Sequence, residues 1–144
     1  MYKRAIVAVD VYDEVGTKQT LKKAAAINIA FGTNLQLICV RASLPGRYMM
    51  IVPKDFQVIE ESKVVQKLIE AAEQAKIDVE QSALLSPTGS VTDEVLAASE
   101  RLGADLIILG AQQSDFSRLF IGSNSNSIMR HSSIDVLLVR FSKD

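Results

Sequence analysis

The chain has 144 residues, which is enough for one packed domain and too few for two independent cores. Hydrophobic residues make up 48% of the chain and charged residues 23%, a balance that excludes a disordered or fibrous protein. Sixteen basic residues against 17 acidic ones leave a formal net charge of −1, so the chain has no surplus of positive charge for sequence-independent binding to nucleic acid. We therefore expect one globular domain over residues 1–144 and no nucleic-acid partner.

The single cysteine and the N-terminal segment bear on where the protein resides. Cys39 has no second cysteine to pair with, which fits a reducing compartment. The first apolar run, Ala5–Val9, is shorter than the roughly 7–15 residues of a secretory signal and the roughly 18 of a membrane helix. We therefore expect a cytoplasmic protein with no membrane partner.

Five short apolar segments predict β-strands, and the longer stretches between them have helical spacing. The third segment alternates apolar and polar residues, as expected for a half-exposed strand near an edge. The other four are almost continuously apolar, which is typical of strands covered by helices on both faces. The pattern predicts an α/β protein with a single open parallel sheet that is doubly wound. The predicted strands are Ala5–Val9, Leu35–Val40, Ile77–Ala83, Asp105–Leu109 and Asp135–Phe141.

The first intervening stretch repeats apolar residues every four positions at Leu21, Ala25 and Ile29. Thr17 is the N-cap that this pattern predicts, and Gly32 is the C-terminal stop. The region from Arg41 to Asp55 contains prolines, a glycine and apolar residues without periodicity, and it predicts an irregular loop.

Two further stretches have an apolar helical face, and a last helix is expected to open near Gly122. Acidic residues in the first turn of the third helix and Gly103 after it agree with helix polarity. The face of the second helix consists of Val64, Leu68, Ala71 and Ala75, and that of the third consists of Val91, Val95, Ala98 and Leu102.

Ligands of open parallel sheets bind beyond the carboxyl ends of the strands, so the residues that follow each strand deserve inspection. Asp10 follows the first strand, and a polar loop follows Gly110. The run from Gly122 to Ser127 places a glycine and small polar residues at the expected start of the last helix. Such a start can hold a phosphate on backbone N–H groups, and it can equally well only cap the helix. Asp10 likewise suits either a ligand contact or a local backbone cap.

Five segments carry a family resemblance: residues 7–10, 37–40, 103–110, Gly122-Ser123 and 133–139. Their order and spacing resemble the universal stress protein family over essentially the whole chain. The resemblance implies a flavodoxin- or Rossmann-like sheet with strand order 3-2-1-4-5. It also implies dimerisation through the last strand and membership of either an ATP-binding or a nucleotide-free branch.

If the chain follows the ATP-binding branch, the resemblance assigns ligand contacts to residues at the ends of the first, second and fourth strands, in the loop after the fourth strand and at the start of the last helix. Magnesium would then be held only through the nucleotide phosphates. The implied residues are Ala8, Val9, Asp10 and Val40 for adenine and ribose, and Leu109, Gly110, Gln113, Gly122, Ser123 and Asn124 for the phosphate loop.

The chain departs from the family's nucleotide motif, G-x2-G-x9-G-[ST], in two ways. Gln113 stands where the second glycine belongs, and eight residues instead of nine separate it from Gly122. A side chain at that position projects where backbone would approach a phosphate. Gly122-Ser123 resembles the ATP-binding branch, whereas the loop around Gln113 resembles the nucleotide-free branch.

Three functional hypotheses follow. The first is a stress-response regulatory module that binds an adenine nucleotide as a signal or as a slowly turned-over substrate. The second is a nucleotide-free dimer that acts through protein contacts, with the Arg41–Asp55 loop as a surface. The third is a phosphoryl-transfer enzyme, for which the sequence offers no convincing general base. A phospho-accepting receiver domain lacks its acceptor aspartate after the third strand and its lysine after the fifth.

The remaining reactive side chains have structural explanations. His131 is the only histidine and lies near the end of the last predicted helix, where it can bond to exposed carbonyls. No second histidine or cysteine stands at metal-binding spacing, so a zinc site is not expected. No catalytic residue is expected either. Cys39 lies inside an apolar strand and is expected to be a core residue.

The last strand is apolar and contains neither proline nor lysine. In the strand order that the resemblance implies, this strand lies at an edge, where an unprotected strand invites aggregation. Pairing with the same strand of a second copy would remove that hazard, so a homodimer through Val136–Phe141 is expected.

Overall fold

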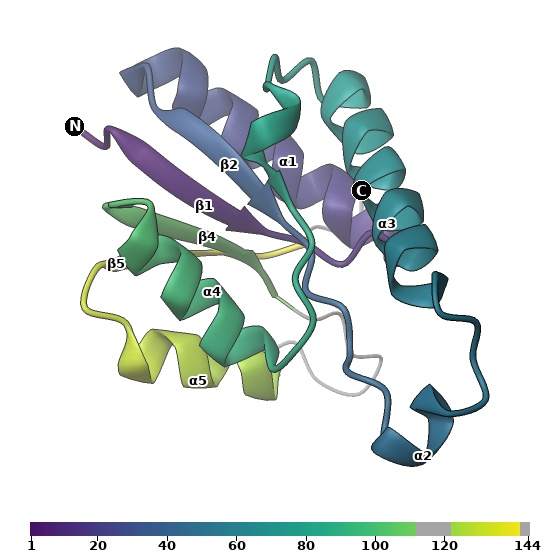
Figure 1. The fold of residues 1–144 in the computed structure, drawn as a ribbon. Coiled ribbons are helices and arrows are strands. Elements are labelled where there is room, and N and C mark those ends of the chain that lie inside the picture. Colours follow the sequence, from purple (N-terminus) through teal and green to yellow (C-terminus); the bar gives the residue numbers. More distant parts are fainter. Residues whose placement is uncertain (112–121, 142–144) are drawn as a thin grey trace.

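A computed structural model describes residues 1–111 and 122–141 and has one five-stranded, all-parallel sheet in the order β3-β2-β1-β4-β5 (Figure 1). The predicted fold class and strand order are therefore confirmed. The strands are β1 (Arg4–Ala8), β2 (Asn34–Ile38), β3 (Leu84–Leu85), β4 (Leu106–Gly110) and β5 (Asp135–Val139).

Two layers of helices cover the two faces of the sheet (Figure 1). One face carries α1 (Glu14–Phe31) and α3 (Phe56–Gln74), and the other carries α4 (Val91–Arg101) and α5 (Ser123–His131). A short helix, α2 (Gly46–Met49), and a 3-10 turn, η1 (Gln81–Ala83), complete the elements. No helix of the described ranges has both the length and the apolarity that crossing a bilayer requires.

Alternate residues of each strand enter the two cores. Val7 and Ile108 pack toward α1 and α3, whereas Ile6 and Ile107 pack toward α4 and α5, and all four are fully buried. A strand covered on both faces must be apolar at every position. This explains why β1, β2 and β4 read as almost continuous apolar runs, with Gln36 as the polar exception inside β2.

The start of α1 differs from the prediction. Asp13, not Thr17, is the N-cap, because its Oδ1 accepts a hydrogen bond from the Gly16 N–H at 3.0 Å. Thr17 lies one turn inside the helix, is buried, and donates its hydroxyl to the Asp10 carbonyl. Gly32 ends the helix in the left-handed conformation, as predicted.

Two other expectations were wrong. Ile29 is 84% exposed because the buried face of α1 runs through Leu21 and Ala24 instead. The third strand is not Ile77–Ala83: Ile77 is buried at the turn that follows α3, and the two-residue β3 begins only after η1. The apolar and polar residues alternate in this segment because Ile77 and Val79 pack against the core, but the backbone there does not pair with β2. The Arg41–Asp55 segment is irregular except for α2.

Asp105 connects the amino ends of the two central strands through hydrogen bonds. Its two carboxylate oxygens accept hydrogen bonds from the Lys3 and Arg4 N–H groups at 2.9 and 3.1 Å. The Arg4 guanidinium also donates to the Leu102 carbonyl. These contacts tie the start of β1 to the turn that precedes β4.

Replacing Asp105 with Asn should lower the free energy of unfolding at neutral pH, because an amide offers one acceptor oxygen where the carboxylate uses two. Hydrogen bonds from Lys3 and Arg4 hold the pKa of Asp105 below its ordinary value of 3.8. The stabilisation is thus complete above that value and fades as the pH falls through the lowered folded-state pKa. Urea denaturation at about pH 7 and about pH 3 should show the difference between the two proteins shrinking in acid. Equal stabilities at neutral pH would contradict this role.

Candidate functional site

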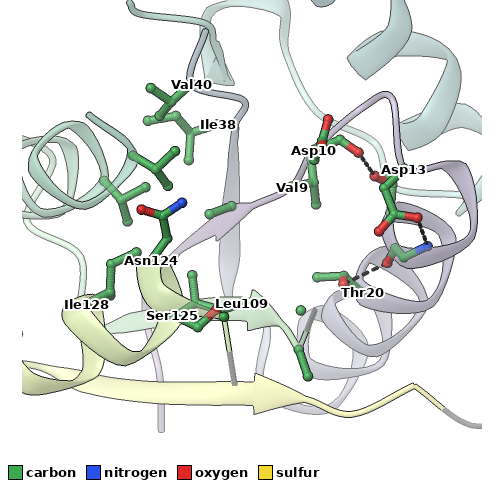
Figure 2. Close-up of a pocket in the computed structure, with 18 of the residues that line it drawn as sticks. Val9, Asp10, Asp13, Thr20, Ile38, Val40, Leu109, Asn124, Ser125 and Ile128 are labelled. Carbon is green, nitrogen blue, oxygen red and sulfur yellow. Dashed lines mark hydrogen bonds between the residues drawn. The ribbon is translucent and has the colours of Figure 1, made fainter. Parts of the chain in front are cut away.

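A cavity of about 320 Å³ lies beyond the carboxyl ends of β1, β2 and β4 (Figure 2). Its position follows from topology: the crossovers leave β1 and β4 in opposite directions, so the loops diverge between these two strands. Its lining residues are Ala8, Val9, Asp10, Asp13, Gly16, Thr17, Thr20, Ile38, Val40, Val91, Val95, Leu109, Gly110, Ala111, Gly122, Asn124, Ser125, Ile128 and Phe141.

Most of the residues singled out from the sequence come together here. Eight of these ten residues line the cavity. Ser123 is exposed at the first position of α5, away from the lining, and Gln113 lies outside the described residues. The eight are Ala8, Val9, Asp10, Val40, Leu109, Gly110, Gly122 and Asn124.

The wall near β2, α4 and α5 is mainly apolar. Ile38, Val40 and Leu109 come from strand ends, and Val95 and Ile128 come from the two helices on that face. Figure 2 shows the Asn124 amide reaching toward the cavity beside this apolar wall. Such a surface suits a flat apolar group that needs one or two directed hydrogen bonds.

The opposite wall is polar and belongs to the start of α1. Asp10 is exposed, and its Oδ1 accepts a hydrogen bond from the Tyr12 N–H at 3.0 Å. It therefore caps local backbone and also lines the cavity. The Asp13 carboxylate is already used as the cap of α1, and the Thr20 hydroxyl donates to the Gly16 carbonyl.

The start of α5 contrasts with that of α1. Its N-cap, Gly122, is buried and has no side chain to accept from the first-turn N–H groups. Gly122, Asn124 and Ser125 line the cavity. Uncapped N–H groups at a helix start favour an anion, so a negatively charged ligand group is best placed at this end.

Phe141 lines the cavity and was not predicted as a site residue. A Cβ atom built on Gly110 would lie 2.8 Å from Phe141 Cζ and 2.5 Å from Thr20 Oγ1, and one built on Gly16 would lie 3.1 Å from Phe141 Cζ. The ring therefore packs into space that these two glycines leave open. Gly16 and Gly110 could have indicated a bulky neighbouring side chain, but that side chain, Phe141, is distant from both in the sequence.

The other singled-out side chains have the structural roles expected. Cys39 is buried, and burial raises the pKa of its thiol, which keeps it protonated. His131 Nδ1 lies 2.8 Å from the Ser127 carbonyl oxygen in the last turn of α5. Within residues 1–111 and 122–141, no three His, Cys, Asp or Glu side chains gather as metal ligands would.

The fold and the cavity define an open α/β protein with a ligand-sized space at the switch point of its sheet. The universal stress protein family profile matches residues 1–140. The chain belongs to the universal stress protein family.

Relatives of known sequence carry the same family name. Universal stress protein G of Shigella flexneri is 44% identical over 52 residues, which are 36% of this chain and 37% of that protein. The match thus spans little more than a third of that relative's length. A universal stress protein A homolog of Pasteurella multocida is 27% identical over 142 residues, covering 96% of each chain.

Solved structures share the fold. A universal stress protein from Archaeoglobus fulgidus has a TM-score of 0.73 and 18% identity, covering 96% of this chain and 99% of its own. One in complex with cAMP has a TM-score of 0.66 and 24% identity over 98% of each chain. One from Archaeoglobus fulgidus in complex with dAMP has a TM-score of 0.66 and 16% identity, covering 96% of this chain and 98% of its own.

Replacing Gly110 with Ala should destabilise the protein by about 1–3 kcal/mol, because the added methyl group overlaps Thr20 and Phe141. Urea denaturation measures the change. Gly46→Ala is the matched control, since a Cβ atom there meets nothing within 4 Å. If Gly110→Ala were as stable as Gly46→Ala, the ring would not pack against Gly110 as described.

Proposed function

We propose that the cavity binds an adenine nucleotide and that the protein works as a regulatory module of the stress response. The observation that carries the proposal is the cavity itself, which gathers eight of the ten residues implied by the family's ATP-binding branch. Two structural neighbours were solved with cAMP and dAMP, which are adenine nucleotides. The buried Cys39 thiol fits residence in the cytoplasm.

The two walls of the cavity suggest how the nucleotide lies. The adenine ring would pack on the apolar wall at Val40 and Leu109, and the ribose hydroxyls would face the Asp10 carboxylate. The phosphates would lie at the uncapped start of α5, near Gly122 and Asn124. We propose ATP as the ligand, with magnesium held through its phosphates. Because no general base is assigned, we propose a signalling ligand that is turned over slowly at most.

The first test is the nucleotide content of the purified protein. The chain has no Trp and only three Tyr residues, so co-purified adenine would raise absorbance at 260 nm relative to 280 nm, and chromatography of the denatured protein would identify it. Calorimetric titration of the stripped protein with ATP and magnesium should then give a saturable heat change. An empty protein that gives no such signal would overturn the proposal.

A pair of variants tests the position of the phosphates. Asn124→Ala should weaken nucleotide binding roughly fivefold, since it removes one hydrogen-bonding group from the cavity wall. Asn126→Ala is the matched control, because Asn126 is exposed on the same helix and does not line the cavity. Titration calorimetry on both variants gives the comparison. Equal affinities would place the ligand elsewhere.

We also propose a homodimer through β5. This strand is the last of the sheet, and residues 136–138 are only half-buried in the isolated chain. The Val139 carbonyl accepts from the Ala111 N–H, so the peptide groups alternate and the Leu138 N–H faces away from β4. That outward N–H is available to a second copy of the strand.

Leu138→Pro should convert the dimer to a monomer, because it removes an outward N–H without breaking the ladder to β4. Light scattering coupled to gel filtration measures the mass, and circular dichroism checks that the variant is folded. The wild type as a monomer at micromolar concentration, or a folded variant that remains dimeric, would contradict this interface.

A further inference from the structure

The sulfur of Met49 is hydrogen-bonded and also lies within reach of solvent. Met49 is the last residue of α2, is 47% exposed and belongs to neither buried core. Its Sδ accepts a hydrogen bond from the Gln57 side-chain amide at 3.8 Å, so the contact joins α2 to the first turn of α3. Met50, the next residue, is 88% exposed. Two adjacent methionines are therefore open to the same reagents, and the first of them has a polar partner beside its sulfur.

The Arg41 side chain fixes the orientation of the Gln57 amide. A guanidinium has only donors, and Arg41 Nη1 donates to Gln57 Oε1 at 3.1 Å. The amide oxygen must therefore face Arg41, which leaves the amide NH2 group facing Met49. Arg41 is itself held in place, because its side chain is only 13% exposed, donates to the Ser86 carbonyl at 2.8 Å and pairs with Glu61 at 3.5 Å. The donor that faces the sulfur is thus already positioned.

Oxidation would give this donor a better acceptor. A thioether sulfur accepts weakly, whereas methionine sulfoxide is polar and accepts through its oxygen. The 3.8 Å between Met49 Sδ and Gln57 Nε2 is spanned by an S–O bond followed by a hydrogen bond of ordinary length, bent at the oxygen. An oxygen added on this side of the sulfur therefore fits between the two side chains in their present positions.

We propose that Met49 is a site of reversible oxidation by peroxide, and that its sulfoxide fastens α2 to the start of α3 through Gln57. The sulfur lone pair attacks one oxygen of hydrogen peroxide and the O–O bond breaks. The other oxygen leaves as water after taking the proton of the transferred hydroxyl, so the sulfur is oxidised and the peroxide is reduced. A dithiol reductase reverses the change: the sulfoxide oxygen leaves as water and the dithiol becomes a disulfide.

The expected effect is stabilisation of a local contact. Methionine oxidation disrupts a protein when it places a polar group in a core, but Met49 lies outside both cores. Its sulfoxide gains a hydrogen bond, whereas that of Met50 faces water because this residue is 88% exposed. Met49 and Gln57 do not line the cavity, so the test of this site does not depend on nucleotide binding.

The experiment adds graded amounts of hydrogen peroxide to the full chain and follows oxygen uptake at each methionine by peptide mass spectrometry. Amide hydrogen exchange of α2 is compared before and after oxidation. In Met50→Leu, which leaves Met49 as the oxidisable residue of this segment, oxidation should slow exchange in α2 roughly two- to tenfold, the effect of one added neutral hydrogen bond. Methionine sulfoxide reductase with a dithiol should restore the original rates.

Gln57→Glu in the Met50→Leu background is the matched control. It keeps an acceptor oxygen for Arg41 and removes the amide donor that faces Met49. Met49 should still gain oxygen in this variant, but exchange in α2 should not slow. Met49→Leu is a second control that leaves the contact between Gln57 and Arg41 untouched, and oxidation of its Met50 should also leave exchange in α2 unchanged.

Three results would overturn the proposal. One is that Met49 of the wild type stays unoxidised at peroxide doses that oxidise Met50 completely. Another is that oxidised Met49 leaves exchange in α2 unchanged or makes it faster. The third is that oxidation slows exchange equally in Gln57→Glu or in Met49→Leu, which would assign the effect to a contact other than the one between this sulfur and this amide.

Discussion

The pairing of β1 with β4 is the constraint on which the rest of the molecule depends. These strands lie at the centre of the sheet, and their registered residues, Ala5 with Leu106 through Ala8 with Leu109, are buried nearly throughout. Because both faces of the pair are covered, burial leaves room for almost no polar side chain until the strands end. Polar side chains therefore appear only beyond the strands, where Asp10 after β1 and Asn124 and Ser125 at the start of α5 line the cavity.

The Phe141 side chain connects this central pair to the edge of the sheet. Phe141 follows β5, yet its ring lies against Gly110 of β4 and Gly16 of α1. Interiors are close-packed, so a shift of β5 displaces the ring rather than compressing it. The residue two positions after the edge strand is therefore part of the ligand cavity.

The sequence was sufficient for the architecture because burial on both faces leaves a strong periodic signal. It also identified eight of the 19 described residues that line the cavity, because residues at strand ends converge by topology and the family resemblance assigned these positions. It failed where position depends on contacts distant in sequence. The alternation from Ile77 did not indicate that the strand on the outer side of β2 would consist only of Leu84 and Leu85.

Local alternatives caused the other errors. Thr17 and Asp13 are both residue types that cap helices, but the helix begins at Glu14, so Asp13 caps it by accepting from the Gly16 N–H and Thr17 lies one turn inside. Ile29 continued an apolar repeat of four residues, but a helix turns every 3.6 residues, so the repeat drifts off the buried face by the end of α1. Phe141 was missed because nothing near it in the chain indicates Gly16 or Gly110.

The end of β2 connects the cavity to the start of the segment that carries α2. Val40 lines the cavity, and the next residue, Arg41, donates hydrogen bonds to Ser86 and Gln57. The same arginine joins the β3 side of the sheet, through Ser86, to the first turns of α3, through Gln57 and Glu61. A ligand that moved the backbone at Val40 would change the geometry of Arg41 within one peptide unit.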